Sequence, residues 1–264
     1  MADALALLSL YLDWGVDTAL DDQPHDRLQA AEVHAAPPVV PDATSPLPPQ
    51  ARTPKAASLR PTPTTDSLAG DALRRAAGCA TIEALGAALR DFDGCALRQT
   101  ATHTLAPTGA HGAPVMVVGE APEAEEDRTG QLLDGPIGAL TRRMFQTIGL
   151  EAFSYAPVVP WRPPGGRPPS DIELRLCLPF LRRAIVLLAP RRLVVMGALP
   201  ARVLLDDTPA RLRGRWHALD AGGDTPVQAL VMRHPGQFAA SPAARRESWQ
   251  DLLRLRAELD KEMT

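Results

Sequence analysis

Short apolar runs alternate with helical segments through most of the chain, and this alternation most constrains the fold. Each run is almost wholly apolar, as expected of a strand buried on both faces of a sheet. The runs cover 114–119, 153–160, 193–197 and 227–232. Helical patterns between the runs therefore predict an α/β fold, with a four-stranded parallel sheet flanked by helices.

The helical segments have recognisable starts and apolar stripes. Ser170 and Glu173 form a capping-box pattern, and Ser241 followed by Pro242 is a typical helix start. The helices expected are 81–90, 138–148, 170–188, 200–205 and 241–263.

Polar residues follow the predicted strands at the point where each strand ends. Glu120 follows the first run, Arg162 follows the second, and His234-Pro235 follows the fourth. Ligands of open parallel sheets bind at the carboxyl ends of the strands. The sequence therefore predicts a site that joins an acid, an arginine and a histidine at one edge.

The N-terminal quarter has a different composition. Nine prolines and no aromatic residue lie between Pro37 and Pro63. Such a segment buries too little apolar surface to offset the entropy of ordering it. We expect a short helix in residues 1–20 (from Ala4 to Leu12), a disordered Pro/Ala-rich linker in 21–67, and one folded domain in 68–264.

Composition excludes several classes of protein. No stretch of about 18 uncharged apolar residues is present, so we expect no membrane span. A secretory signal is not expected, because no basic segment precedes the apolar N-terminus. Three cysteines are too few for a disulfide scaffold and fit a reducing cytoplasm. The net charge of −3 gives no general argument for nucleic-acid binding, so DNA contact needs a local basic patch.

Five acidic residues lie between Glu120 and Asp127. Clustered carboxylates can bind a hard cation, although a solvated loop is the simpler interpretation. Glu120 at the sheet edge can instead orient a water molecule or stabilise a developing cation. A histidine such as His234 is often structural, but at a strand end it can donate a hydrogen bond to an anionic leaving group.

Arginines gather in two loops. Arg213 and Arg215 lie in a basic segment that ends at Trp216, while Arg162 and Arg167 flank a Pro/Gly loop. These side chains can follow a phosphate backbone, or they can be scattered solvated charges.

Taken together, the motifs make the chain resemble a family 4 uracil-DNA glycosylase of the alphaproteobacterial type. No single motif is specific, but their order and spacing are. The segments that carry the resemblance are Gly94-Cys-Ala-Leu-Arg98, Val118-Gly-Glu-Ala-Pro122, Glu126-Asp-Arg128, Val158-Val-Pro-Trp-Arg-Pro-Pro-Gly165, Cys177-Leu-Pro-Phe-Leu181, Leu212-Arg-Gly-Arg-Trp216 and His234-Pro235.

The resemblance implies hydrolysis of the N-glycosidic bond of a deoxyuridine flipped out of DNA. Glu120 is then expected to position water or stabilise the sugar cation with help from Glu126, and His234 to stabilise the departing uracil anion. The implied base pocket comprises Ala121, Pro122, Leu133 and Pro157. The implied DNA-binding residues are Arg162, Arg213, Arg215 and Pro235.

The chain departs from the family pattern at the base pocket. Leu133 stands where the family has a phenylalanine that stacks on uracil, and Pro157 where it has an asparagine that reads the base. Glu123 replaces a glycine of the first motif. These substitutions predict weak and poorly selective activity.

A second departure concerns the iron–sulfur cluster of the family. Only Cys95 and Cys177 match its four cysteine ligands, while Phe92 and Trp161 stand at the other two positions. We expect no 4Fe-4S cluster, no metal and no other cofactor, with the two aromatic side chains filling the space. A zinc site built on the two thiols and a histidine is an alternative.

Two other functions remain open from sequence. The chain can be a DNA-binding protein that has lost catalysis, or a glycosylase for another deaminated base. In each case the expected partner is DNA, single- or double-stranded. We expect a monomer that acts on bacterial DNA in the cytoplasm, without membrane contact.

Overall fold

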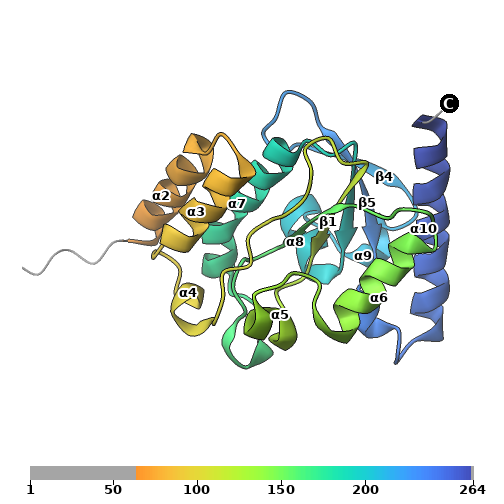
Figure 1. Ribbon diagram of the computed structural model, residues 1–264, viewed down its shortest axis with the longest axis horizontal. Helices are drawn as coiled ribbons and strands as arrows, with labels where there is room; N and C mark the ends of the chain where they lie inside the picture. The colour runs from red at the N-terminus through yellow and green to blue at the C-terminus, as the bar shows by residue number, and fades with distance from the viewer. Residues whose placement is uncertain (1–63, 263–264) are drawn as a thin grey trace, which may run out of the picture. The chain divides into compact units, whose positions relative to one another are not determined.

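The computed structural model describes residues 64–262, and Figure 1 shows their arrangement. The helix expected in residues 1–20 and linker residues 21–63 lie outside the described part. The first helix of the described residues, α2 (Thr65–Gly78), starts inside the segment expected to be linker. Thr64 caps it by accepting a hydrogen bond from the Ser67 backbone N–H. The folded part therefore begins slightly earlier than residue 68.

A five-stranded sheet in the order β2-β1-β3-β5-β4 forms the centre of the fold. Its parallel strands are β1 (Val115–Gly119), β2 (Ser154–Pro157), β3 (Arg192–Met196) and β5 (Val227–Met232). They confirm the four predicted strands. The sheet has one more strand than the four predicted, because β4 (Trp216–Leu219) adds an antiparallel edge to β5.

Helices cover both faces of the sheet (Figure 1). On one face, α2, α3 (Ile82–Asp91) and α7 (Asp171–Leu188) share an apolar core with β1, β2, β3 and β5. On the other face, α6 (Gly135–Gln146) and α10 (Pro242–Glu262) enclose a second core. This covering explains why every residue of β1 is buried, and why the run looked uniformly apolar in sequence.

Short elements connect these layers and shape the sheet edge. They are α4 (Leu97–Thr100), α5 (Ala124–Thr129), η1 (Pro164–Gly166), α8 (Ala198–Leu205), α9 (Pro209–Leu212) and η2 (Pro235–Gln237). No helix among residues 64–262 is both long and apolar enough to cross a bilayer.

The two strands that follow β1 along the chain lie on opposite sides of it in the sheet. The connection after β1 leads outward to β2, while β3 lies on the opposite side of β1. Such a switch point opens a crevice at the carboxyl ends of the strands. Glu120 and Gly197 directly follow β1 and β3, so the fold brings their loops to this crevice.

Candidate active site

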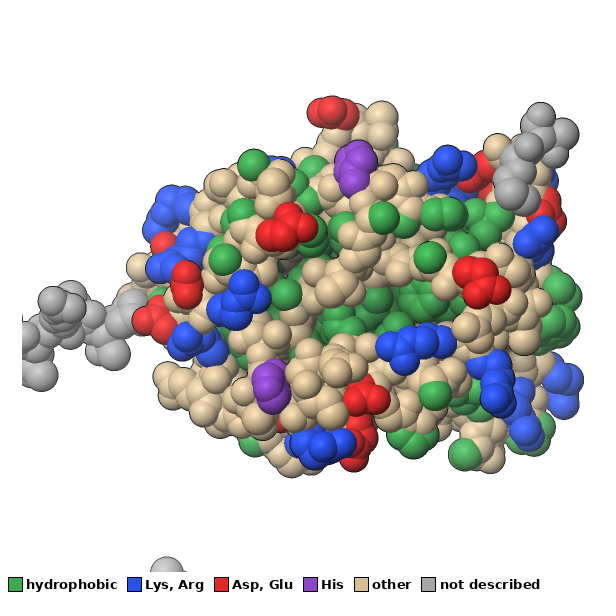
Figure 2. Space-filling model, viewed as in Figure 1, with side chains coloured by type: hydrophobic (Ala, Val, Ile, Leu, Met, Phe, Trp, Pro, Cys, Tyr) green, Lys and Arg blue, Asp and Glu red, His purple; other side chains and the backbone are tan. Residues whose placement is uncertain are grey.

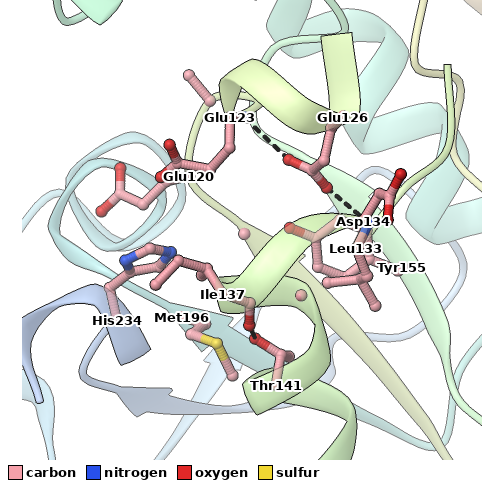
Figure 3. Close-up of a pocket in the computed structure, with 13 residues that line it drawn as sticks. Glu120, Glu123, Glu126, Leu133, Asp134, Ile137, Thr141, Tyr155, Met196 and His234 are labelled. Carbon is pink, nitrogen blue, oxygen red and sulfur yellow. Dashed lines mark hydrogen bonds between the residues drawn. The ribbon is translucent and has the colours of Figure 1, made fainter. Parts of the chain in front are cut away.

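A narrow pocket lies at the carboxyl ends of the central strands, between α5, the start of α6 and the loop after β5 (Figure 3). Its free volume is about 20 Å³, which is room for about one water molecule. Polar and apolar groups alternate around it. The lining residues are Gly119, Glu120, Ala121, Glu123, Glu126, Leu133, Asp134, Ile137, Gly138, Thr141, Tyr155, Met196 and His234.

Glu120 is held at one side of the pocket by the start of α8. Its Oε1 accepts hydrogen bonds from the backbone N–H groups of Ala198, at 2.7 Å, and Leu199, at 3.2 Å. Gly197 permits this approach, because a Cβ there would collide with the carboxylate. Burial raises the pKa of Glu120, while the two N–H groups oppose that shift. The other oxygen, Oε2, has no hydrogen bond from residues 64–262 and can hold a water.

His234 approaches the pocket from the loop after β5 (Figure 3). Burial lowers its pKa, so the imidazole is neutral near pH 7. Its Nδ1 accepts a hydrogen bond from the Gly236 N–H at 3.3 Å. A neutral ring that accepts at Nδ1 carries its proton on Nε2. His234 therefore offers a hydrogen-bond donor without a positive charge.

Glu126 acts on the pocket through the backbone. One carboxylate oxygen accepts from the Glu123 N–H at 2.9 Å, and the other accepts from the Leu133 N–H at 2.6 Å. Leu133 lies on a loop with a left-handed φ of 59°, which is strained for a side chain of this size. Glu126 thus positions the Leu133 loop, and both of its oxygens are engaged.

The structure brings together only part of the predicted base pocket. Ala121 and Leu133 line it beside Glu120 and His234. Pro122 is buried but is not among the lining residues. Pro157 contacts a separate small cavity on the other face, near Cys177. Pro157, at the end of β2, is therefore not among the residues that line the pocket.

Tyr155 is one of several lining residues that were not predicted from sequence, and it carries the polar group nearest to the end of β1. It lies within β2, and its ring is buried against the second core with the side chain reaching the pocket. Interior strand residues alternate between faces, so Tyr155 lay on the face opposite Ala156. This alternation is the sequence feature that could have indicated on which face of the sheet Tyr155 lies. The pocket therefore has an aromatic ring in its lining, although Leu133 supplies none.

Arg213 does not have the geometry of a phosphate-binding side chain. Its guanidinium contacts Asp251 at 2.8 Å and Glu247 at 2.6 Å, and only 13% of the side chain is exposed. Asp251 is fully buried, so this pair fastens the loop before β4 to α10. These ion pairs indicate a structural role for Arg213, and its predicted contact with DNA stays a prediction.

The other predicted DNA contacts differ in exposure. Arg215 is exposed, with one bond to the Arg211 carbonyl. Arg162 is half-buried in the loop after β2. Pro235 is buried in η2, where it shapes the loop that carries His234. Arg215 and Arg162 therefore remain candidates for phosphate binding.

A second groove lies between α6 and α10, lined mainly by apolar side chains and by two arginines. Arg143 and Arg245 line it together with Trp249, whose side chain is 47% exposed. Neither arginine forms an ion pair with residues 64–262. Basic side chains also gather over the neighbouring parts of α6 and α10 at the lower right of Figure 2. Arg143 lies on α6 and Arg245 on α10, so the packing of the two helices brings these arginines to one groove.

The four positions that correspond to the cluster ligands lie together in the first core. Phe92 contacts Phe180 with ring centroids 5.3 Å apart, and the Trp161 indole N–H donates to Thr104 Oγ1 at 3.0 Å. Cys95 and Cys177 are buried free thiols. Their mutual hydrogen bond, with burial, raises the pKa of Cys177. Two thiols beside two packed aromatic rings do not fit a four-cysteine cluster, and residues 64–262 contain no metal-ligand group of three or more His, Cys, Asp or Glu.

In comparisons with known proteins, the chain is similar to several type-4 uracil-DNA glycosylases. It is 32% identical over 146 residues to the type-4 uracil-DNA glycosylase of Pyrobaculum aerophilum, which covers 52% of this chain and 74% of that protein. The corresponding enzyme of Archaeoglobus fulgidus is 28% identical, covering 60% of this chain and 82% of that protein. That of Thermotoga maritima is 33% identical over 94 residues, covering 35% and 49%.

The family model for these proteins matches residues 106–253, which span the sheet and the pocket. The match includes both side chains that face each other there, Glu120 and His234. The chain belongs to the uracil-DNA glycosylase superfamily.

Proposed function

We propose that the chain hydrolyses the N-glycosidic bond of uracil in DNA and so begins base-excision repair. The observation that carries this proposal is the pairing of Glu120 with His234 across one pocket. One is a carboxylate with a free oxygen, and the other is a neutral donor. Glycosidic cleavage needs both functions, because the sugar becomes cationic as the base leaves as an anion.

The residues then divide the reaction between them. As the bond between C1′ and the base nitrogen breaks, the Glu120 carboxylate stabilises the positive sugar and orients a water through Oε2. The water supplies hydroxide to C1′, and its proton ends on the departing base. His234 donates from Nε2 to the base while negative charge develops there, a type of stabilisation worth roughly 2–4 kcal/mol.

The pocket is too small for the base in this structure, so binding requires a change in its shape. A free volume of about 20 Å³ does not admit a pyrimidine, so one wall must move. We propose that Leu133 is the wall that moves, because a left-handed φ is unfavourable for leucine and a shift of this loop would relieve it. Glu126 limits that movement through its bond to the Leu133 N–H.

DNA is the proposed partner of this site. Arg215, Arg162 and the two arginines of the groove between α6 and α10 supply the charges for phosphate contact. That the protein acts as a monomer, on single- or double-stranded DNA, in the bacterial cytoplasm, stays a prediction.

We further propose that the protein works without an iron–sulfur cluster. The support is the chemistry of the four positions, where two thiols adjoin Phe92 and Trp161 in a packed core. Purified protein is expected to be colourless and free of stoichiometric iron. Visible absorbance in the violet-to-blue range together with bound iron contradicts this proposal.

A base-release assay tests the proposed function. Labelled oligonucleotides carrying uracil, hypoxanthine or xanthine are incubated with the protein, and abasic sites are cleaved with alkali. We expect cleavage at uracil and none with an otherwise identical thymine oligonucleotide. Binding of DNA without release of any of the three bases would contradict a glycosylase and favour a non-catalytic DNA-binding protein.

A further inference from the structure

Tyr155 forms a fixed wall of the pocket. Its backbone N–H donates to the Thr108 carbonyl at 2.8 Å, and its carbonyl accepts from the Thr108 N–H at 2.9 Å. On the other side its strand pairs with β1, where Val117 is its partner in register. The backbone is therefore held from both sides, in contrast to the strained loop of Leu133. A side chain on such a support is well placed to set specificity.

Gly119 makes room for the phenol at the end of β1. A Cβ at this position would collide with the Tyr155 hydroxyl oxygen. The hydroxyl therefore lies beside the last residue of β1, next to Glu120, where both residues line the pocket. No larger residue at position 119 is compatible with this placement.

The hydroxyl has unused hydrogen-bonding capacity. It forms no hydrogen bond with residues 64–262, although buried phenols usually find a partner. Burial and the nearby negative charges of Glu126 and Glu120 raise its pKa, so the group keeps its proton. A neutral phenol can donate one hydrogen bond and accept others.

We propose that the Tyr155 hydroxyl hydrogen-bonds the polar edge of the flipped base and is a specificity-determining residue of the pocket. This inference rests on the proposed function. No asparagine or glutamine lines the pocket, so no side-chain amide is available there to recognise the base. The Tyr155 hydroxyl can form such a hydrogen bond instead. Its ring adds an apolar surface against the base.

A hydroxyl reads a base differently from an amide. A carboxamide has its donor and acceptor on different atoms, whereas a hydroxyl turns to donate to a carbonyl or to accept from an amino group. Tyr155 thus contributes affinity for several deaminated bases. It discriminates between oxo and amino groups less sharply than a fixed amide.

The chain offers a direct probe, because it has only two tyrosines, Tyr11 and Tyr155. Protein labelled with 3-fluorotyrosine gives two fluorine NMR signals, which the variants Tyr155→Phe and Tyr11→Phe assign. The ligand is a short single-stranded oligonucleotide carrying a 2′-fluorinated deoxyuridine, whose glycosidic bond resists hydrolysis. We expect the Tyr155 signal to shift with this ligand, and to shift less with the matching oligonucleotide that carries a tetrahydrofuran abasic analogue and so has no base to contact the hydroxyl.

Kinetics give the second readout. Tyr155→Phe removes only the hydroxyl and keeps the ring, so the fold is retained, as thermal melting checks. We expect kcat/KM for uracil release to fall roughly 3- to 10-fold, the size of one hydrogen bond. Tyr11→Phe is expected to match the wild type. Affinity for DNA without uracil is expected to stay the same in both variants.

The outcomes separate this inference from the proposed function. Uracil release by the wild type, with an unmoved Tyr155 signal and an unimpaired Tyr155→Phe variant, overturns the inference and leaves the function standing. A Tyr155 signal that shifts with the uracil ligand, in a protein that releases no base, supports the contact and overturns the proposed function.

Discussion

Two glutamates, the half-buried Glu120 and the buried Glu173, have carboxylates at helix starts and show how differently the protein uses the same side chain. Glu173 lies at the start of α7 and accepts from the Ser170 N–H at 2.7 Å, while Arg167 contacts its two oxygens at 2.6 and 2.9 Å. Arg167 holds the pKa of Glu173 at about 2. Glu120 also accepts two backbone N–H groups at a helix start, yet burial raises its pKa.

The difference lies in the counter-charge. Glu173 forms an ion pair with Arg167, and both of its oxygens accept hydrogen bonds that hold the loop before α7 in place. Glu120 forms no ion pair with residues 64–262 and keeps one oxygen open to the pocket. A carboxylate that is buried without a cation and faces a cavity is typical of a functional site, whereas a fully paired one is typical of a structural site. The predictions below test this division.

The largest effect on stability is expected in the packed region around the two thiols. Trp161 is almost completely buried, and Trp161→Ala leaves a cavity and an unpaired Thr104 hydroxyl. We expect a loss of about 3–5 kcal/mol in the free energy of unfolding, measured by urea denaturation. At a temperature where the variant is folded, uracil release is expected to be retained. A selective loss of catalysis in folded protein would show that this region belongs to the site.

His234→Ala is expected to act in the opposite way. It removes the neutral donor from the pocket while leaving the cores intact, so the barrier to base release rises by roughly 2–4 kcal/mol. Single-turnover rates of uracil release measure this change. His217→Ala is the matched control, because His217 lies outside the pocket lining. Equal rates for His234→Ala and the wild type would remove His234 from the mechanism.

Glu173→Gln tests the structural carboxylate and its pH dependence. Because the folded-state pKa is lowered to about 2, the ionised form stabilises the fold at neutral pH. That contribution is complete above the ordinary value of 4.5 and disappears as the pH falls towards 2. We expect the variant to lose roughly 1.5–3 kcal/mol of stability at pH 7.

Chemical denaturation at several pH values measures the difference between the two proteins. It is expected to shrink steadily between pH 4.5 and 2. A difference that does not change with pH over this range would show that charge is not the cause.

The smallest effect is expected from the exposed arginines. Arg215→Ala removes one solvent-exposed charge, so DNA affinity should fall modestly and the slope of log affinity against log salt should decrease by about 1. Fluorescence anisotropy at several salt concentrations gives this slope. Arg213→Ala is the comparison, since it is expected to lower the melting temperature and to leave the slope unchanged in folded protein. A reduced salt slope for Arg213→Ala would restore it as a DNA contact.

The sequence predicted the parts of the fold that have a strong local signal. The four buried strands were visible as apolar runs, and the Ser170 capping box is present as expected. Strand β4 was missed because its residues are mostly half-buried or exposed, so it has no apolar run. Helix α2 was missed because its only buried side chains are the small residues Ala72 and Ala76.

The site residues that could be predicted from sequence are those that follow the ends of strands. Glu120 and His234 meet in one pocket because both directly follow strands of one sheet. The partners of Arg213 could not be predicted, since Asp251 reaches it only through the packing of α10, 38 residues away. Tyr155 was not predicted, because it lies within β2 and the prediction considered only residues that follow the strands.

The most direct test of the account is uracil release by Glu120→Gln compared with the wild type at saturating protein. Glutamine keeps the size of the side chain and can still accept from Ala198, but it has no negative charge. The account predicts a rate roughly 10²–10⁴-fold lower, with affinity for uracil DNA nearly unchanged. In the wild type, the rate should also fall as the pH is lowered, beginning at a higher pH than for an ordinary glutamate, because burial raises the pKa of Glu120. A Glu120→Gln variant that releases uracil at the wild-type rate would contradict the account.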